Sequence, residues 1–172
     1  MNEAFWISVV VALGVAQALQ VALLGAMSRA RGPAEAAFVS ILGTVAGLAL
    51  VLALRGVFGS KIALPAPFDH PIVIGAIAVT SAVLLALALR GLSPVYAVTG
   101  LGAVPFLVSA SFLAPRIGIG LFLAAFVAGQ IGGGVLLDHV GAFGTMARSV
   151  DAPRVVGIAA LLVGVALVRG VR

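Results

Sequence analysis

The sequence predicts an all-α integral membrane protein in which six transmembrane helices form a single domain over residues 1–172. The first observation is composition: 63% of the residues are hydrophobic and 9% are charged, with a mean hydropathy of +1.30. A soluble domain is about half apolar and about a quarter charged, and one of this size buries only about 70% of its unfolded surface. The second observation is spacing, because the charged residues lie between long apolar segments. The solvent around those segments must be lipid.

Six apolar segments can cross a bilayer as helices, which takes roughly 20 residues each. A β-barrel would need alternating polar and apolar positions, whereas these segments are apolar on every face. Helices are the other structure that satisfies every backbone amide in lipid. The N-terminal segment has no basic leader, so we expect it to remain as the first helix rather than to be a cleaved signal peptide. The predicted helices cover residues 5–28, 34–54, 71–89, 94–113, 117–137 and 153–169.

Prolines mark the starts of four of these helices, because a missing N–H costs nothing in a first helical turn. Glu35 then falls in the first turn of the second helix, where the helix dipole favours a carboxylate. A substrate or proton site is the alternative interpretation of Glu35. The four prolines are Pro33, Pro71, Pro94 and Pro153.

Two further prolines lie in or near the fourth segment. Pro105 is expected to kink this helix, since proline removes one helical hydrogen bond and its ring crowds the preceding turn. Pro115 is expected to end it. Pro105, Pro115 and the nearby Gly118 are therefore predicted hinge points.

The ten basic residues give no clear instruction about orientation. Lys and Arg normally accumulate on the cytoplasmic side of a membrane protein. With six helices, one side would hold Arg55, Lys61, Arg116, Arg169 and Arg172, and the other Arg29, Arg31, Arg90, Arg148 and Arg154. The division stays five against five if residues 71–89 do not span. Either the first helix alone decides orientation, or copies insert both ways and pair antiparallel, with the symmetry of the inverted repeats of transporters.

Several polar side chains lie inside the apolar segments. An amide or hydroxyl in hydrocarbon is costly unless it is paired, so these side chains should face the interior of the helix bundle. They either hold helices together or line a substrate cavity. No ionisable residue lies near the middle of a segment, which favours a neutral, zwitterionic or amphipathic solute over a bare ion. The cavity candidates are Gln17, Gln20, Ser40, Thr44, Tyr96, Ser109 and Gln130.

Glycine pairs indicate close helix packing. Gly43 with Gly47, and Gly129 with Gly133, form G-x-x-x-G patterns, which allow helices to approach closely in lipid. The second pattern is not a phosphate-binding loop, because the Gly-Lys-Ser/Thr sequence is missing. The adjacent Asp138-His139 pair most simply marks the end of the fifth helix.

Other functional classes are not favoured. The chain has no cysteine, and we predict neither a metal site nor a cofactor. Without a basic run there is no indication of nucleic-acid binding. An enzyme is not expected, since no nucleophile–base pair is evident.

Four stretches resemble the YdcZ-like family of the drug/metabolite transporter superfamily. They are LQVALLGAMSRARGPAEAAFVSILGTVAG (19–47), GLGAVPFLVSASFLAPRIG (100–118), GQIGGGVLLDHVGAFG (129–144) and RVVGIAALLVGVALV (154–168). The resemblance implies a half-sized inner-membrane transporter unit, typically of five helices, which works as an antiparallel homodimer, a heterodimer or a fused pair. Ile72–Leu89 would then be an additional helix. The family's asparagine after the first-helix glutamine is Leu24 here, so Gln20 lacks that neighbouring amide.

The sequence thus favours a dimeric membrane transporter that exposes a central cavity alternately to each side. Its expected partners are membrane lipids, an unidentified small-molecule substrate and a second, antiparallel copy, or alternatively an oppositely oriented paralogue. A passive dual-topology channel and a non-transporting assembly subunit remain as alternatives. Substrate, direction of transport and coupling ion are left open.

Overall fold

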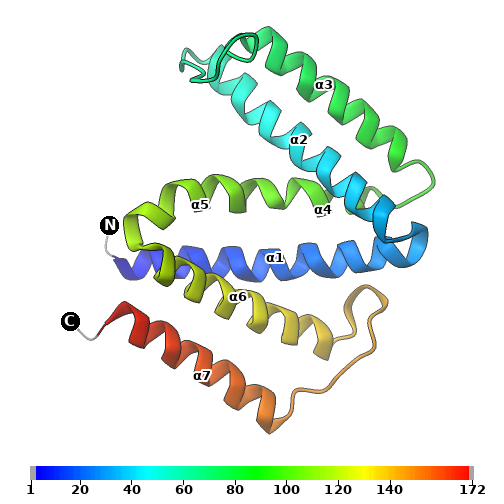
Figure 1. Cartoon of the computed structure of the whole chain (residues 1–172). Coiled ribbons are helices and arrows are strands. Elements are labelled where there is room, and N and C mark those ends of the chain that lie inside the picture. Colours follow the sequence, from blue (N-terminus) through cyan, green and yellow to red (C-terminus); the bar gives the residue numbers. More distant parts are fainter. Residues whose placement is uncertain (1–2, 171–172) are drawn as a thin grey trace. The chain divides into compact units, whose positions relative to one another are not determined.

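The computed structural model describes residues 3–170, and over this range it contains helices and no strand (Figure 1). Six helical segments are long and apolar enough to cross a membrane, which confirms the predicted fold class. They are α1 (Glu3–Arg31), α2 (Pro33–Val57), α3 (Pro71–Ala88), the broken segment η1 (Pro94–Ala97), α4 (Val98–Leu101) and α5 (Ala103–Ile117), then α6 (Ile119–His139) and α7 (Ala152–Arg169). A short 3-10 helix, η2 (Ala142–Gly144), lies in the loop before α7.

Single glycines separate two pairs of consecutive helices. Gly32 lies between α1 and α2 with φ 105°, and Gly118 lies between α5 and α6 with φ 90°. Residues with a side chain rarely adopt such angles, whereas glycine adopts them readily. One residue is therefore enough to end a helix and redirect the chain. Pro33 begins α2 and Glu35 lies in its first turn, as predicted.

The two prolines of the fourth segment behave differently. The helix is interrupted at Gly102, three residues before Pro105, so the predicted kink lies close to this proline. The prediction that Pro115 ends the helix is wrong, because Pro115 lies inside α5, which continues to Ile117. Proline fixes φ at a helical value and removes only one hydrogen bond, which the last turn of a helix tolerates. The glycine geometry at Gly118 ends this helix instead.

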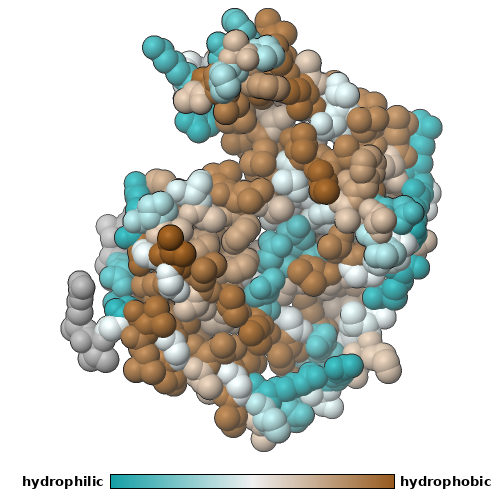
Figure 2. Space-filling model, viewed as in Figure 1, coloured by the Kyte–Doolittle hydropathy of each residue, from teal (hydrophilic) through white to brown (hydrophobic). Residues whose placement is uncertain are grey.

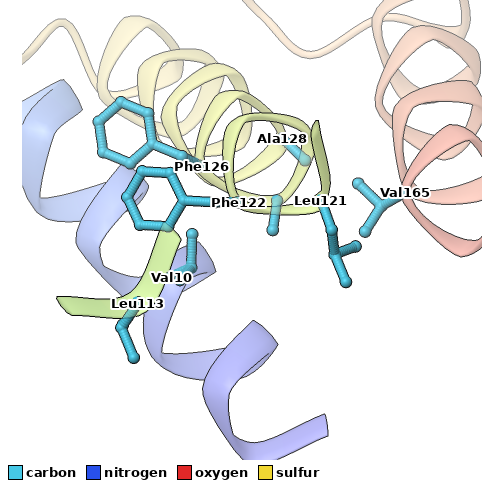
Figure 3. Packing of buried hydrophobic residues seen from close by; sticks show 8 residues of the cluster. Val10, Leu113, Leu121, Phe122, Phe126, Ala128 and Val165 are labelled. Atoms are coloured by element: carbon cyan, nitrogen blue, oxygen red, sulfur yellow. The ribbon is translucent and has the colours of Figure 1, made fainter. Parts of the chain in front are cut away.

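The chain divides into two compact units. The first contains the residues up to Ala26 and those from Pro105 onward, and the second contains Met27–Val104. Figure 3 shows the core of the first unit, where Phe122 and Phe126 of α6 lie side by side near Val10 of α1. Their rings are stacked with centroids 6.2 Å apart. Val165 is the buried residue that α7 contributes to this core.

In the first unit, α1 and α6 touch backbone to backbone. A methyl group on Gly129 would lie 3.0 Å from the Cα of Val11, and one on Gly14 would lie 2.7 Å from the backbone nitrogen of Gln130. One turn further on, Gly133 packs against Val15 in the same way. The contacts pair Val11 with Gly129 and Val15 with Gly133, so the residue numbers rise together along the two helices. The two helices therefore run parallel. Glycine is what permits this approach.

In the second unit, α2 is the central helix. It packs along α3 through the buried residues Ala49, Ile74 and Ala78. The guanidinium of Arg31 donates to the carbonyl oxygens of Ala88, at 2.8 Å, and Arg90. These carbonyls lie at the C-terminal end of α3, where backbone acceptors have no helical donor. Arg31 therefore caps α3.

Charged side chains lie near the helix ends, some of them beside aromatic rings. Figure 2 shows hydrophobic side chains over much of the visible surface, with hydrophilic ones grouped in patches between them. In the first unit, Arg169 pairs with Glu3 at 3.3 Å, and the Arg116 guanidinium lies 3.6 Å from the ring centre of Phe112. Trp6 packs edge-on against Phe112 as well. Aromatic and basic residues typically anchor helices at the lipid–water boundary in this way.

The α1–α6 contact gives a matched pair of variants on one helix. Gly129→Val would place its side chain against the backbone of Val11, while a methyl group on Gly132 meets nothing within 4 Å. Overpacking costs about 1–3 kcal/mol, so we expect Gly129→Val to lower the apparent Tm in detergent by roughly 5 °C or more. Gly132→Val should leave it unchanged. Equal melting temperatures, measured as loss of the monodisperse chromatographic peak on heating, would contradict this packing.

Candidate functional site

The candidate site begins with glutamines at the middle of two helices in the first unit. Gln17 is the central residue of α1 (Glu3–Arg31), and Gln130 follows Gly129, the central residue of α6 (Ile119–His139). The centres of membrane-spanning helices lie deepest in the hydrocarbon, where an unpaired amide is most costly. These positions are therefore expensive to occupy with glutamine.

The parallel contact of α1 and α6 brings these glutamines to similar depth. Gly14 lies beside the backbone of Gln130, and Gln17 follows Gly14 by three residues, which is a rise of about 4.5 Å. Gln20 lies one further turn along α1. Gln17 and Gln130 thus lie within about one helical turn of each other along the helix axes.

The amide groups on α1 are withdrawn from solvent. Gln20 is buried, with 7% of its surface exposed, and Gln17 is half-buried. The Oε1 atom of Gln17 is buried and accepts no hydrogen bond from any residue between 3 and 170. A buried acceptor without a donor costs about 1–3 kcal/mol. A solute carrying an N–H or O–H group could satisfy it.

An aromatic cluster lies along the same helix as Gln130. Phe126 precedes Gln130 by one turn and so lies on the same side of α6. Its ring is 4.5 Å from that of Phe106 of α5, measured between centroids, and Phe122 adds a third ring. Amide and aromatic groups together suit a molecule with a polar end and an apolar body.

The hydroxyl candidates of the second unit have a structural use. Ser40 of α2 donates to the carbonyl oxygen of Thr99 at 2.8 Å. The Thr44 hydroxyl lies between two carbonyl acceptors, that of Gly100 at 3.0 Å and that of Ser40 in its own helix at 2.9 Å. The Thr99 and Gly100 acceptors lie just before the break at Gly102, and Gly43 packs against Gly100 between the two bonds. These contacts favour the interpretation that Ser40 and Thr44 hold helices together.

The remaining candidates are not brought into one cluster. Tyr96, in η1, is half-buried, and its carbonyl oxygen accepts from the hydroxyl of Thr99 at 2.7 Å. Ser109, in α5, is half-buried in the first unit. All four predicted packing glycines lie at close contacts: Gly43 against Gly100, Gly47 against Val104, Gly129 against Val11, and Gly133 against Val15.

Two residues in these contacts, Gly14 and Gly100, were not identified from the sequence. They provide the second half of two close helix contacts. Gly14 carries no G-x-x-x-G pattern, but a small residue one turn before Gln17 was an available signal. Gly100 precedes Gly102 and Pro105, which together indicate an irregular backbone.

Ionisable groups stay at the ends of the helices. Asp138 and His139 are the last two residues of α6, as predicted. The backbone N–H of Arg148 donates to the carbonyl oxygen of Asp138, and that of Val150 donates to Nδ1 of His139, so the loop folds back over this helix end. Among residues 3–170, no three His, Asp or Glu side chains lie close enough to hold a metal ion.

A comparison with protein families confirms the resemblance found in the sequence. The family described as "Putative inner membrane exporter, YdcZ" matches residues 72–167, more than half of the chain. The match includes α3, which the resemblance treated as additional, and does not extend to α1 or α2, where the first of the four similar stretches lies. No curated protein and no solved structure matches the chain.

The hydrogen bonds from α2 can be tested with a matched pair of threonines. Thr44→Val keeps the shape of the side chain but removes the bond to Gly100, while Thr80 of α3 is exposed. Bonds between membrane helices contribute about 0.6 kcal/mol on average, and up to about 1.7. We expect Thr44→Val to lower the apparent Tm by roughly 2–5 °C, and Thr80→Val to leave it unchanged. A Thr44→Val protein as stable as the Thr80→Val protein would show that the bond contributes nothing.

Proposed function

Since this chain belongs to the YdcZ family of inner membrane exporters, we propose that it exports a neutral or zwitterionic amphipathic solute through a pathway lined by Gln17, Gln20 and Gln130. It is a multi-pass inner membrane protein of a transporter family rather than an enzyme family.

The main support for this proposal is the buried Oε1 atom of Gln17, at the centre of a membrane helix. No residue between 3 and 170 donates a hydrogen bond to this oxygen. A glutamine that only joins two helices would be expected to have its oxygen satisfied by one of them. A glutamine that binds solute must offer its oxygen when the site is empty. The unsatisfied oxygen of Gln17 fits the solute-binding role better than the packing role.

The surroundings of the glutamines support a solute without a large net charge. No Asp, Glu, Lys, Arg or His lies near the middle of any of the six spans described. Proton coupling through an intramembrane carboxylate is therefore not part of the proposal. Amide groups would bind the polar end of the solute, and the rings of Phe106, Phe122 and Phe126 would contact its apolar part.

We propose that the working form is an antiparallel homodimer. The basic residues divide evenly between the two sides of the membrane, so neither orientation is favoured by charge. Two oppositely oriented copies would reproduce the inverted symmetry on which many transporters rely. A pathway between two such copies can open alternately to each side by the same movement in reverse.

The breaks in the helices are suited to such movement. Gly102 interrupts the fourth span, Pro105 follows it, and Gly118 connects α5 to α6 with a single residue. Hinges form at element ends where a few residues absorb the change in backbone angles. In this proposal α5 moves between the two breaks.

Gln17→Leu separates the two roles that this glutamine could have. If Gln17 binds solute, the variant should keep or gain thermal stability, because a buried unsatisfied oxygen is removed. Its KM for the transported solute should rise about five- to tenfold. The measurement is uptake into proteoliposomes across a panel of metabolites, cationic drugs and lipids, together with the melting temperature.

The control is Ser111→Ala, since Ser111 is exposed and its hydroxyl bonds to Val108 in its own helix. A loss of stability in Gln17→Leu with unchanged KM would assign Gln17 to helix packing instead. Flux that never saturates with concentration would replace the exporter by a passive channel. If no solute is transported or raises the melting temperature, a non-transporting membrane subunit is the better description.

Orientation is tested by labelling single cysteines in this cysteine-free chain. Ser60 and Ser149 are exposed and lie in loops on opposite sides of a six-helix topology. Dual insertion predicts that each single variant, Ser60→Cys or Ser149→Cys, is labelled about equally by impermeant reagents applied from either side. Labelling of each residue from one side only would exclude the antiparallel homodimer.

A further inference from the structure

The last helix, α7, is the least covered of the six spans. Only 6% of its most apolar 18-residue window is buried, compared with 39% for α6. A groove of about 540 Å³ runs between α6 and α7 and is lined by Leu123 and Val127 on one side and by Gly157, Ala160 and Gly164 on the other. A membrane helix without contacts on its small-residue face has surface available for another helix.

Gly157 and Gly164 differ from the packing glycines within the chain. A methyl group on Gly14, Gly43 or Gly129 would meet backbone atoms of another helix, but one on Gly157 or Gly164 would meet nothing within 4 Å. The two residues are one heptad apart, so they lie on nearly the same line along α7.

We propose that this groove holds α7 of a second copy, antiparallel to the first, with Gly157 of each chain opposite Gly164 of the other. The proposal rests on the antiparallel homodimer proposed above and assigns its interface. The arrangement is self-complementary, as a two-fold interface must be, because each α7 occupies the groove of the other chain.

The charges at the ends of α7 select the antiparallel direction. Asp151 caps the start of the helix, where its carboxylate accepts from the backbone N–H of Arg154 at 3.0 Å, and Arg169 ends it. In the register that pairs Gly157 with Gly164, Asp151 of one copy lies within one residue of the height of Arg169 of the other. Opposite charges then lie at the same height at both ends of the helix pair. A parallel pair would place Asp151 beside Asp151 and Arg169 beside Arg169.

Antiparallel helices also have opposed dipoles, whereas parallel helices would bring like ends together. Arg169 already pairs with Glu3 of its own chain, and both side chains are about half exposed. Arg169 can therefore contact a second carboxylate without leaving the first. Charge and helix direction favour the same register.

Disulfide formation tests the register directly. Copies carrying Gly157→Cys and differently tagged copies carrying Gly164→Cys are expressed together in membranes and oxidised. The antiparallel register predicts cross-links between the two kinds of copy. Cross-links within one kind should be few, because identical positions would be about 10 Å apart along the axis and disulfides need Cα atoms within about 7 Å.

The matched control is the pair Val155→Cys and Leu162→Cys. These exposed residues have the same heptad spacing but lie on nearly the opposite side of α7. Cross-linking of the control pair as strong as that of the glycine pair would overturn the proposal. So would cross-links that form only between identical positions, which indicate a parallel pair.

A bulky substitution gives a second, independent measurement. Gly157→Leu combined with Gly164→Leu should shift purified protein from dimer to monomer, while the melting temperature of the monomer stays unchanged because each side chain enters open space. A dimer that survives this change excludes the groove as interface. If labelling at Ser60 and Ser149 still shows dual insertion in that case, the antiparallel homodimer is retained and only the α7 interface is excluded. If no cross-link forms and lipid chains are found in the groove, the groove binds lipid.

Discussion

The structure depends on one constraint: in hydrocarbon, every backbone N–H and C=O must find its partner within the protein. Five of the six spans meet it as continuous helices between residues 3 and 170. The fourth is interrupted at Gly102, and the hydroxyls of Ser40 and Thr44 lie within hydrogen-bond distance of the carbonyl oxygens of Thr99 and Gly100, shortly before the break. Two polar side chains of α2 thus place hydrogen-bond donors against the backbone next to the break.

Glycine connects this packing to the candidate site. Apolar side chains gain little by leaving lipid for another helix, so close backbone approach and van der Waals contact must hold membrane helices together. Gly14 and Gly129 provide that contact between α1 and α6, where an added methyl group would meet the backbone of the other helix. The same contact fixes Gln17 relative to Gln130. The packing glycines and the glutamines proposed to bind solute are therefore neighbours on the same two helices.

Sequence reasoning gave the helices more reliably than the site. Length, composition and the prolines that begin helices determine the six spans, since these are properties of short segments. The expectation for Pro115 is wrong because a proline near a helix end costs little. Gly14 was not predicted because it belongs to no G-x-x-x-G pattern, and only its position one turn before Gln17 indicates a contact. Ser40 and Gln17 looked equivalent as polar residues in apolar segments. Only the residues that surround each side chain in the structure distinguish the two. The Ser40 hydroxyl bonds to a carbonyl oxygen, whereas the Gln17 amide oxygen has no donor among residues 3–170.

The parallel pairing of α1 with α6 has a consequence for biogenesis. Neighbours in a chain that are joined by one residue can pair as soon as they leave the ribosome, but α1 must wait until more than a hundred further residues have been translated. During that interval Gln17 and Gln20 lie in lipid, or against the insertion machinery, without their final neighbour. The first helix of the nascent protein therefore becomes fully native only after its fifth span has entered the bilayer.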